Sequence, residues 1–258
     1  MNRIKHFRSF STSISQLTKK KNISHSSHKQ SDVNSSYKVT TSRGMINEIF
    51  PKLDYLLVLD FEATCEADSL ILPCQEIIEM PVIALDTETW EEKAKFHQYI
   101  TPTERPILTS FCTQLTGIIQ EMIEGKPHIN DALEMFHEWL KQENIIDSNF
   151  AFVTCGDWDL KVALPNEAKF KGITLPEYYS RWINVKKSHG QYTGQFAKSL
   201  SDLLSFYNIK HEGRLHSGID DAKNIAAIVK ALGFEGHKFR VNSGSSYKER
   251  LFKRSPAN

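Results

Sequence analysis

The amino-acid sequence predicts a three-layer α/β fold in which helices flank a mixed central sheet. Three β-type segments joined by short connections come first, which favours an antiparallel meander. Two helical patterns, one further short strand and several more helical patterns follow in that order. This order of elements predicts a sheet that combines the meander with parallel strands.

The first predicted strand is the apolar run Tyr55–Leu59, which leads directly into Asp60 and Glu62. Its length suits a buried strand and is too short for a free-standing helix. Alternate residues of a strand share a face, so Asp60 and Glu62 point the same way and Phe61 points to the other face. Two adjacent carboxylates are costly at a partly buried site unless a cation neutralises them, and Mg²⁺ prefers oxygen ligands of this kind. These two residues predict part of a metal site; a solvated acidic turn is the alternative.

Two more strands complete the predicted meander. Residues 77–85 form the second, in which Pro81 indicates an edge position or a bulge. Residues 95–100 alternate between apolar and polar and form the third.

Helical spacing then predicts one helix through residues 115–122 and another over 132–140. The apolar residues 150–154 form a short strand. The later helical patterns lie at about 158–169, 176–184, 199–207 and from Gly218 to Leu232.

Two further acidic clusters follow these core elements. Asp157 and Asp159 lie just past strand 150–154, at the kind of position where sites of α/β proteins form, although either is also suited to cap the next helix. Asp221 lies in the first turn of the last helix, and Asp220 points about 100° away from it. His216 precedes that helix. A histidine beside a metal-bound carboxylate accepts a proton from water at neutral pH; the alternative is a structural histidine.

Three acidic clusters with one histidine predict hydrolysis of a phosphodiester. In-line attack needs an activated water and a stabilised leaving oxyanion, and two divalent ions about 3.5–4 Å apart serve both ends. Holding such a pair takes roughly four carboxylates, because the phosphate of the substrate completes the coordination shell.

The spacing Asp60-x-Glu62, Trp158-Asp159 and His216-x-x-x-x-Asp221 resembles the DEDDh branch of the 3′–5′ exonucleases. Within that branch, the sequence is similar to the Eri1-like exoribonucleases, a group that trims RNA 3′ ends. The similar segments are residues 60–66, 115–118, 156–160, 182–185 and 216–224. The resemblance covers about residues 54–245. It implies an RNase H-like fold, two Mg²⁺ or Mn²⁺ ions as cofactors, and nucleoside 5′-monophosphates as products.

The resemblance also implies a role for each site residue. Asp60 would bridge both metals, and Glu62 would bind the metal that holds the catalytic water. Asp159 would hold the second metal, and Asp221 would complete the ligands of the first. His216 would be the general base, so His216 and Glu62 are the predicted catalytic pair. Asp157 and Asp220 depart from the family pattern and are interpreted as supporting or capping groups.

Substrate contacts are predicted next to these motifs. Aromatic and apolar side chains there are suited to stack on a terminal base or to pack in the core. The backbone near Ala63 is suited to read the ribose hydroxyls, which would favour RNA. Residues 186–190 with Arg181 make a candidate phosphate track or, alternatively, a solvated loop. The predicted substrate-binding residues are Phe61, Ala63, Leu115, Thr116, Trp158 and Lys187.

Charge is distributed unevenly along the 258 residues. The whole chain has a net charge of +1, from 32 basic and 31 acidic residues. Residues 1–37 contain seven of the basic residues and one of the acidic ones, which leaves 25 basic and 30 acidic residues elsewhere. Any nucleic-acid binding by the remainder must therefore depend on a local patch or on bound metal rather than on bulk charge. An apolar run of the ~20 residues that span a bilayer is absent from the sequence, so no membrane association is expected.

The sequence divides into three predicted regions. Residues 1–37 are basic, rich in serine and amphipathic, which predicts a disordered segment that acts as a mitochondrial transit peptide. A basic arm of a nuclear or cytoplasmic protein is the alternative. Residues 38–245 form the predicted exonuclease domain, and 246–258 a flexible tail.

The leading functional hypothesis is a metal-dependent 3′–5′ exoribonuclease that acts on single-stranded or overhanging RNA 3′ ends. One alternative is a 3′–5′ exonuclease that acts on DNA or on short oligonucleotides. A second, non-enzymatic alternative is an RNA-binding protein with an inactive nuclease fold. The complete set of five site residues argues against the second alternative, because a degenerate site would be expected to lose ligands.

Overall fold

A six-stranded mixed sheet forms the centre of the structure, a computed structural model that describes residues 52–67, 71 and 73–243. β1 pairs antiparallel with β3 and parallel with β5, and β5 pairs parallel with β6. The expected mixture of antiparallel and parallel strands is therefore confirmed. The strands are β1 (Tyr55–Leu59), β2 (Glu62–Ala63), β3 (Ile77–Asp86), β4 (Glu92–Tyr99), β5 (Phe150–Thr154) and β6 (Trp182–Asn184).

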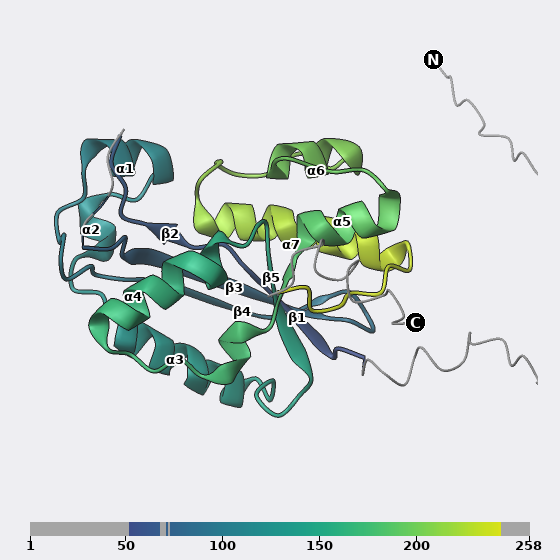
Figure 1. The fold of residues 1–258 in the computed structure, drawn as a ribbon, viewed down its shortest axis with the longest axis horizontal. Coiled ribbons are helices and arrows are strands. Elements are labelled where there is room, and N and C mark those ends of the chain that lie inside the picture. Colours follow the sequence, from purple (N-terminus) through teal and green to yellow (C-terminus); the bar gives the residue numbers. More distant parts are fainter. Residues whose placement is uncertain (1–51, 68–70, 72, 244–258) are drawn as a thin grey trace, which may run out of the picture. The chain divides into compact units, whose positions relative to one another are not determined.

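Helices cover both faces of this sheet, as Figure 1 shows. The α-helices are α1 (Ser110–Thr116), α2 (Gln120–Ile123), α3 (Ile129–Gln142), α4 (Leu164–Lys171), α5 (Val185–Thr193), α6 (Leu200–Phe206) and α7 (Gly218–Phe234). Two shorter helical turns are η1 (Asp159–Ala163) and η2 (Glu177–Ser180). In the described part of the chain, no helix has both the length and the apolar character needed to cross a bilayer.

The two faces of the sheet bury separate hydrophobic cores. Leu57 and Leu59 of β1 pack with α3 and α4, whereas Leu56 and Val58 pack with α5, α6 and α7. This division follows from the alternation of side chains along a strand. Because both faces are covered, β1 is apolar at every position up to its end, where the first acidic residue appears.

Pro81 lies in an internal strand, so its expected edge position is wrong. It pairs with His97 of β4 on one side of β3. On the other side it faces the interruption between Leu59, the last residue of β1, and Glu62 in β2. A proline has no N–H to give to a ladder, and here the neighbouring ladder is already interrupted. The register shift between Glu62 and Ala63 fits the alternative of a bulge.

Two predicted helices are wrong. The predicted helix over 115–122 is two helices, because α1 ends at Gly117 in the left-handed conformation with φ 78°. The predicted helix over 176–184 is the short turn η2 followed by strand β6, and the next helix, α5, begins only at Val185. The predicted segments 1–37 and 246–258 lie outside the described residues and stay predictions.

Candidate metal-dependent active site

The end of β1 positions the first two acidic residues. β1 stops at Leu59, and the chain resumes pairing with β3 at Glu62 in β2. Asp60 is half-buried and Glu62 is buried with 8% of its surface exposed. The strand geometry expected from the sequence thus places two carboxylates next to each other at the edge of the core.

The first turn of α7 supplies a third carboxylate. One oxygen each from Asp60, Glu62 and Asp221 lies within 4.8 Å of the other two. The Oδ2 atom of Asp221 accepts a hydrogen bond from the backbone N–H of His216 (2.9 Å). Residues separated by about 160 positions in the sequence therefore form one acidic cluster, as the sequence predicts.

Asp159 lies beside this cluster, at the start of η1. Its Oδ1 atom accepts a hydrogen bond from the backbone N–H of Phe61 (3.0 Å), the residue between Asp60 and Glu62. The charge of Asp159 is the largest single like-charge contribution to the raised pKa of Asp60. Asp159 is not one of the three residues within 4.8 Å of one another, but it is close enough to affect them. A π-type turn such as η1 is a frequent feature of functional sites.

Burial and mutual repulsion make the cluster costly to ionise in the absence of a cation. Burial, followed by the charges of Asp159 and Glu62, raises the pKa of Asp60 well above its usual value. Burial and the charge of Glu79 raise the pKa of Glu62 to about 9. Burial also raises the pKa of Asp159, to about 6, and that of Asp221. A divalent cation would relieve this repulsion.

One oxygen of the cluster also has no partner of its own. The Oδ1 atom of Asp221 is buried without a hydrogen bond. Its nearest ion-pair partner, Nε2 of His211, lies 3.7 Å away, which is longer than a hydrogen bond. Buried oxygens are normally satisfied, so this one fits a cation ligand. The carboxylate donor set is the kind that Mg²⁺ and Mn²⁺ prefer.

His216 lies at the open side of the cluster. Its side chain is exposed, and its backbone adopts a left-handed conformation with φ 60°. A protonated imidazole at this position would lower the pKa of Asp221. The backbone N–H of His216 donates to Oδ2 of the same carboxylate (2.9 Å). Left-handed backbone in a non-glycine residue is costly, and such residues are frequent at active sites.

A family model with the description RNase_T, Exonuclease, matches residues 57–229. The chain belongs to this exonuclease family. ERI1 exoribonuclease 3 from Homo sapiens is 47% identical over 192 residues, which cover 73% of this chain and 56% of that protein. The 3'-5' exonuclease Snipper from Drosophila melanogaster is 36% identical over 203 residues, covering 72% of each protein. The chain spans just over half the length of the ERI1 exoribonuclease 3 proteins that it matches.

Solved structures agree with this assignment. The nuclease domain of 3'hExo, described as a DEDDh family member bound to rAMP, is 32% identical with a TM-score of 0.71. That alignment covers 74% of this chain and 97% of the domain. A 3'-exonuclease solved for its recognition of a histone mRNA stem-loop is 31% identical, also with a TM-score of 0.71, and the match covers 75% and 87% of the two chains. The chain has the RNase H-like fold of this DEDDh, ERI1-like group.

The predicted substrate-binding residues of the exonuclease differ in exposure. Phe61, Ala63 and Thr116 are buried, so their side chains are not exposed for contact with a ligand. The Thr116 hydroxyl is used inside α1, where it donates to the carbonyl of Cys112. Trp158 is 37% exposed, which leaves its ring free to contact a ligand.

Leu115 is half-buried, and its carbonyl is hydrogen-bonded to a residue of the loop that contains His216. The guanidinium group of Arg214 donates to the carbonyl of Leu115 (2.7 Å) and also to the carbonyl of Gln114. The same side chain lies over Gly117, where a Cβ atom would be 3.1 Å from its Nη1. Arg214 therefore joins the end of α1 to the loop before α7, a link that no sequence motif indicated.

Lys187 lies on a helix rather than on the solvated loop considered from the sequence. It is part of α5, and its Nζ donates to Oδ2 of Asp157 (2.7 Å). Asp157 also accepts hydrogen bonds from Trp182 and Asn184 of β6. These contacts explain why Asp157 is absent from the acidic cluster: it ties the end of β5 to β6 and α5.

Asp220 is likewise used for local structure. It accepts from the backbone N–H of Arg214 and pairs with Lys223 one turn along α7. The interpretation of Asp157 and Asp220 as supporting groups agrees with these contacts.

Glu79 was not predicted from the sequence to have a role near the site. This residue is 1% exposed in the middle of β3 and pairs with Glu62 of β2. Its carboxylate accepts from His97 and from the first N–H groups of α7. An acidic residue inside the apolar run 77–85 is a signal that a buried carboxylate has partners elsewhere.

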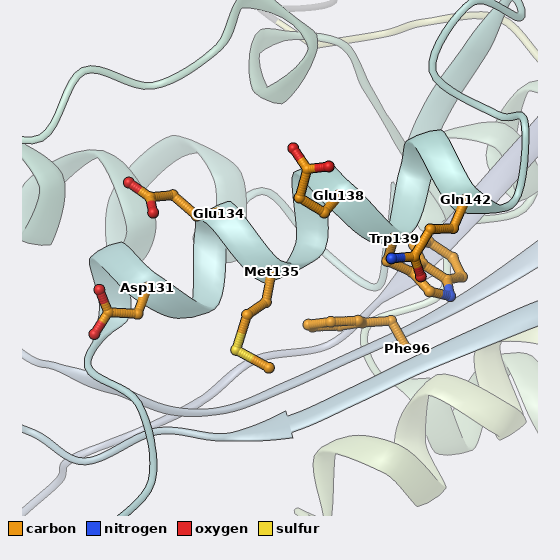
Figure 2. Close-up of a pocket in the computed structure, with 7 residues that line it drawn as sticks. All are labelled: Phe96, Asp131, Glu134, Met135, Glu138, Trp139 and Gln142. Carbon is orange, nitrogen blue, oxygen red and sulfur yellow. The ribbon is translucent and has the colours of Figure 1, made fainter.

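A pocket between α3 and β4 lies apart from the acidic cluster (Figure 2). Three carboxylates, from Asp131, Glu134 and Glu138, lie along it, and Phe96 and Trp139 form its apolar part. Among its lining residues there is no basic side chain to meet a phosphate. This pocket therefore does not suit an RNA backbone.

Proposed function

We propose that the protein is a metal-dependent 3′–5′ exoribonuclease that trims single-stranded or overhanging RNA 3′ ends and releases nucleoside 5′-monophosphates. The observation that supports this most strongly is the acidic cluster of Asp60, Glu62 and Asp221, with Asp159 and His216 beside it. The names of the similar proteins include both exoribonucleases and a 3'-5' exonuclease.

Each site residue has a distinct task in this reaction. Asp60, Glu62 and Asp221 would hold the cations, and Asp159 would supply a further carboxylate. When bound, two divalent ions activate the attacking water and neutralise charge at the leaving oxygen. The exposed imidazole of His216 accepts the proton of that water, since a neutral imidazole is an effective base near neutral pH.

RNA is the proposed substrate, with Mg²⁺ as the proposed ion and Mn²⁺ as a substitute. Similar proteins named exoribonucleases and a solved complex with a histone mRNA stem-loop support an RNA substrate. Hard oxygen ligands support either ion. The preference for single-stranded ends follows from the need to place the last phosphodiester bond within the acidic cluster.

A product-resolved assay tests the proposal. The full chain is incubated with matched 5′-labelled single-stranded RNA and DNA, in Mg²⁺ or in excess chelator. We expect RNA to shorten progressively from its 3′ end, with nucleoside 5′-monophosphates as products and no cleavage in chelator. Equal or faster cleavage of DNA would reject the RNA assignment and support the alternative of a DNA exonuclease.

Asp60→Asn is the control for this assay. Asn has nearly the same shape but lacks the charge, so the variant should fold and fail to cleave. Cleavage by this variant at the wild-type rate would show that another site or a contaminating nuclease produces the activity.

A further inference from the structure

Glu79 connects two distant parts of the chain through its carboxylate. Its Oε1 atom lies 2.7 Å from Nε2 of His97 and accepts from the backbone N–H of Ile219 (3.3 Å). Its Oε2 atom accepts from the backbone N–H of Gly218 (3.0 Å). Gly218 and Ile219 are the first two residues of α7, about 140 positions further along the chain. Glu79 thus joins the middle of β3 to the start of α7.

These contacts suit both groups chemically. The first N–H groups of a helix have no partner within the helix, and the positive end of its dipole favours a negative charge. Ser217 precedes α7 but makes no side-chain capping hydrogen bond. Glu79, which lies in strand β3, therefore caps the start of helix α7.

Gly218 brings α7 into direct contact with the end of β1. A Cβ atom on Gly218 would lie 2.7 Å from the carbonyl oxygen of Asp60 and 3.0 Å from Oε2 of Glu79. Only a residue without a side chain allows so close an approach. The start of α7 is therefore held between the backbone of one proposed metal ligand and the carboxylate of Glu79.

The position of this helix start determines where two site residues lie. Asp221 is in its first turn, and His216 lies two residues before it. The partner of Glu79 across the sheet is Glu62. After burial, Glu79 makes the largest contribution to the raised pKa of Glu62, which reflects how close the two carboxylates are.

We propose that Glu79, held by His97, is a positioning residue that aligns Asp221 and His216 with Asp60 and Glu62. Glu79 is neither a metal ligand nor a proton acceptor in this account. Its effect is exerted through the backbone of α7, and the inference rests on the proposed metal-dependent function. Residues that orient metal ligands typically affect metal affinity or activity by 10- to 100-fold when they are changed.

The test compares Glu79→Ala and Glu79→Gln with a matched control, Glu76→Ala. Glu76 lies three positions earlier and is also fully buried. Its carboxylate accepts from the backbone of residues 103–105 and pairs with Lys171, so it supports a loop and α4 instead of α7. Loss of Glu76 removes more hydrogen bonds than loss of Glu79, six against three, without touching the start of α7.

Four quantities are measured on each full-length variant: kcat and KM for single-stranded RNA, the Kd for Mn²⁺ by calorimetry, and the melting temperature. We expect Glu79→Ala to lower kcat and weaken Mn²⁺ binding by roughly 10- to 100-fold, with the KM for RNA little changed. The losses of kcat and Mn²⁺ affinity should be smaller in Glu79→Gln, because its amide oxygen still accepts from an N–H of α7. Glu76→Ala should lower the melting temperature without changing the kcat or the Kd for Mn²⁺ of the folded protein.

Wild-type kcat and Mn²⁺ affinity in Glu79→Ala would overturn the proposal, as would an equal loss of both in Glu76→Ala. If Glu79→Ala does not fold, Glu79→Gln decides, and it must then show a reduced kcat and weaker Mn²⁺ binding. Mn²⁺ binding also separates this inference from the proposed activity. A wild-type protein that binds Mn²⁺ but cleaves no RNA would reject the activity, while the comparison of Mn²⁺ affinities would still test the role of Glu79.

Discussion

Glu62 shows how neighbouring groups set the properties of a single residue in this protein. Its pKa is raised from 4.5 to about 9, first by burial and then by the carboxylates around it. At neutral pH the metal-free folded protein therefore keeps a proton on Glu62 that the unfolded chain releases. A cation reverses this preference, because it favours the ionised form.

The raised pKa of Glu62 predicts how the stability of the metal-free protein depends on pH. The folded state binds the proton of Glu62 more tightly than the unfolded chain, so ionisation of Glu62 destabilises the fold. This loss of stability is absent below about pH 4.5, grows as the pH rises, and is complete above about pH 9. The variant Glu62→Gln has no ionisable group at this position, so its stability should not fall in this way as the pH rises. We expect the melting temperature of the variant, measured in chelator, to exceed that of the wild type by a margin that widens from pH 5 to pH 9. A constant margin over that range would contradict the assigned direction of the shift.

His216 and His211 offer a matched pair of substitutions, since both lie near Asp221. His216→Ala should lower kcat by roughly 10²- to 10⁴-fold, the typical contribution of a general base, while Mn²⁺ affinity is retained. His211→Ala should lower kcat far less. Nε2 of His211 lies 3.7 Å from Oδ1 of Asp221, but His211 is not proposed to accept the proton. Rates of RNA cleavage at saturating Mg²⁺ provide the comparison. A larger loss in His211→Ala would exchange the roles of the two histidines.

The site residues could be recognised from the sequence because their chemistry is local. Asp60 and Glu62 follow an apolar run, and the spacing of His216 and Asp221 is typical of a known family. The role of Glu79 was not recognisable in this way. Its partners in α7 are about 140 positions away, and a single glutamate in a strand does not indicate which helix it will cap.

Among the elements, α7 has the greatest influence on the site, because its first turn meets the end of β1. Gly218→Ala would place a methyl group 2.7 Å from the carbonyl oxygen of Asp60, so the helix must move. We expect a loss of roughly 1–3 kcal/mol in the free energy of unfolding, as for other overpacked sites, together with weaker Mn²⁺ binding. Denaturant unfolding and calorimetry measure the two effects.

Gly156→Ala is the control for that substitution. A Cβ atom on Gly156 would meet only the backbone nitrogen of Trp158, at 4.0 Å, which is an ordinary contact. If both glycine variants lost the same stability and Mn²⁺ affinity, close packing at Gly218 would not explain the result.

Elements with a clear apolar pattern were predictable, and elements whose pattern was too short or was broken by one residue were not. The predicted start of α7 near Gly218 and the strands β1 and β5 are confirmed. Strand β6 has only three residues, Trp182–Asn184, too few to show a period, and it was interpreted as part of a helix. The break between α1 and α2 depends on the left-handed conformation of Gly117, which the apolar spacing did not reveal.

For the whole molecule, charge separates the N-terminal segment from the rest of the chain. Seven basic residues and one acidic residue lie in 1–37, and the remainder is acidic overall. We propose that this segment directs import into mitochondria. Residues 1–40 fused to a fluorescent reporter should bring it to mitochondria, because a basic, amphipathic, serine-rich segment that is nearly free of acidic residues is typical of such signals. A diffuse or nuclear signal would favour the alternative of a basic arm.

We propose above all that the carboxylates of the residue after β1, of β2, of η1 and of α7 together hold divalent cations beside His216. Anomalous scattering from crystals grown with Mn²⁺ and a nucleoside 5′-monophosphate tests it most directly. We expect two Mn²⁺ peaks about 3.5–4 Å apart, between the carboxylates of Asp60, Glu62, Asp159 and Asp221. Well-ordered carboxylates with no Mn²⁺ between them, or Mn²⁺ bound only elsewhere on the protein, would contradict it.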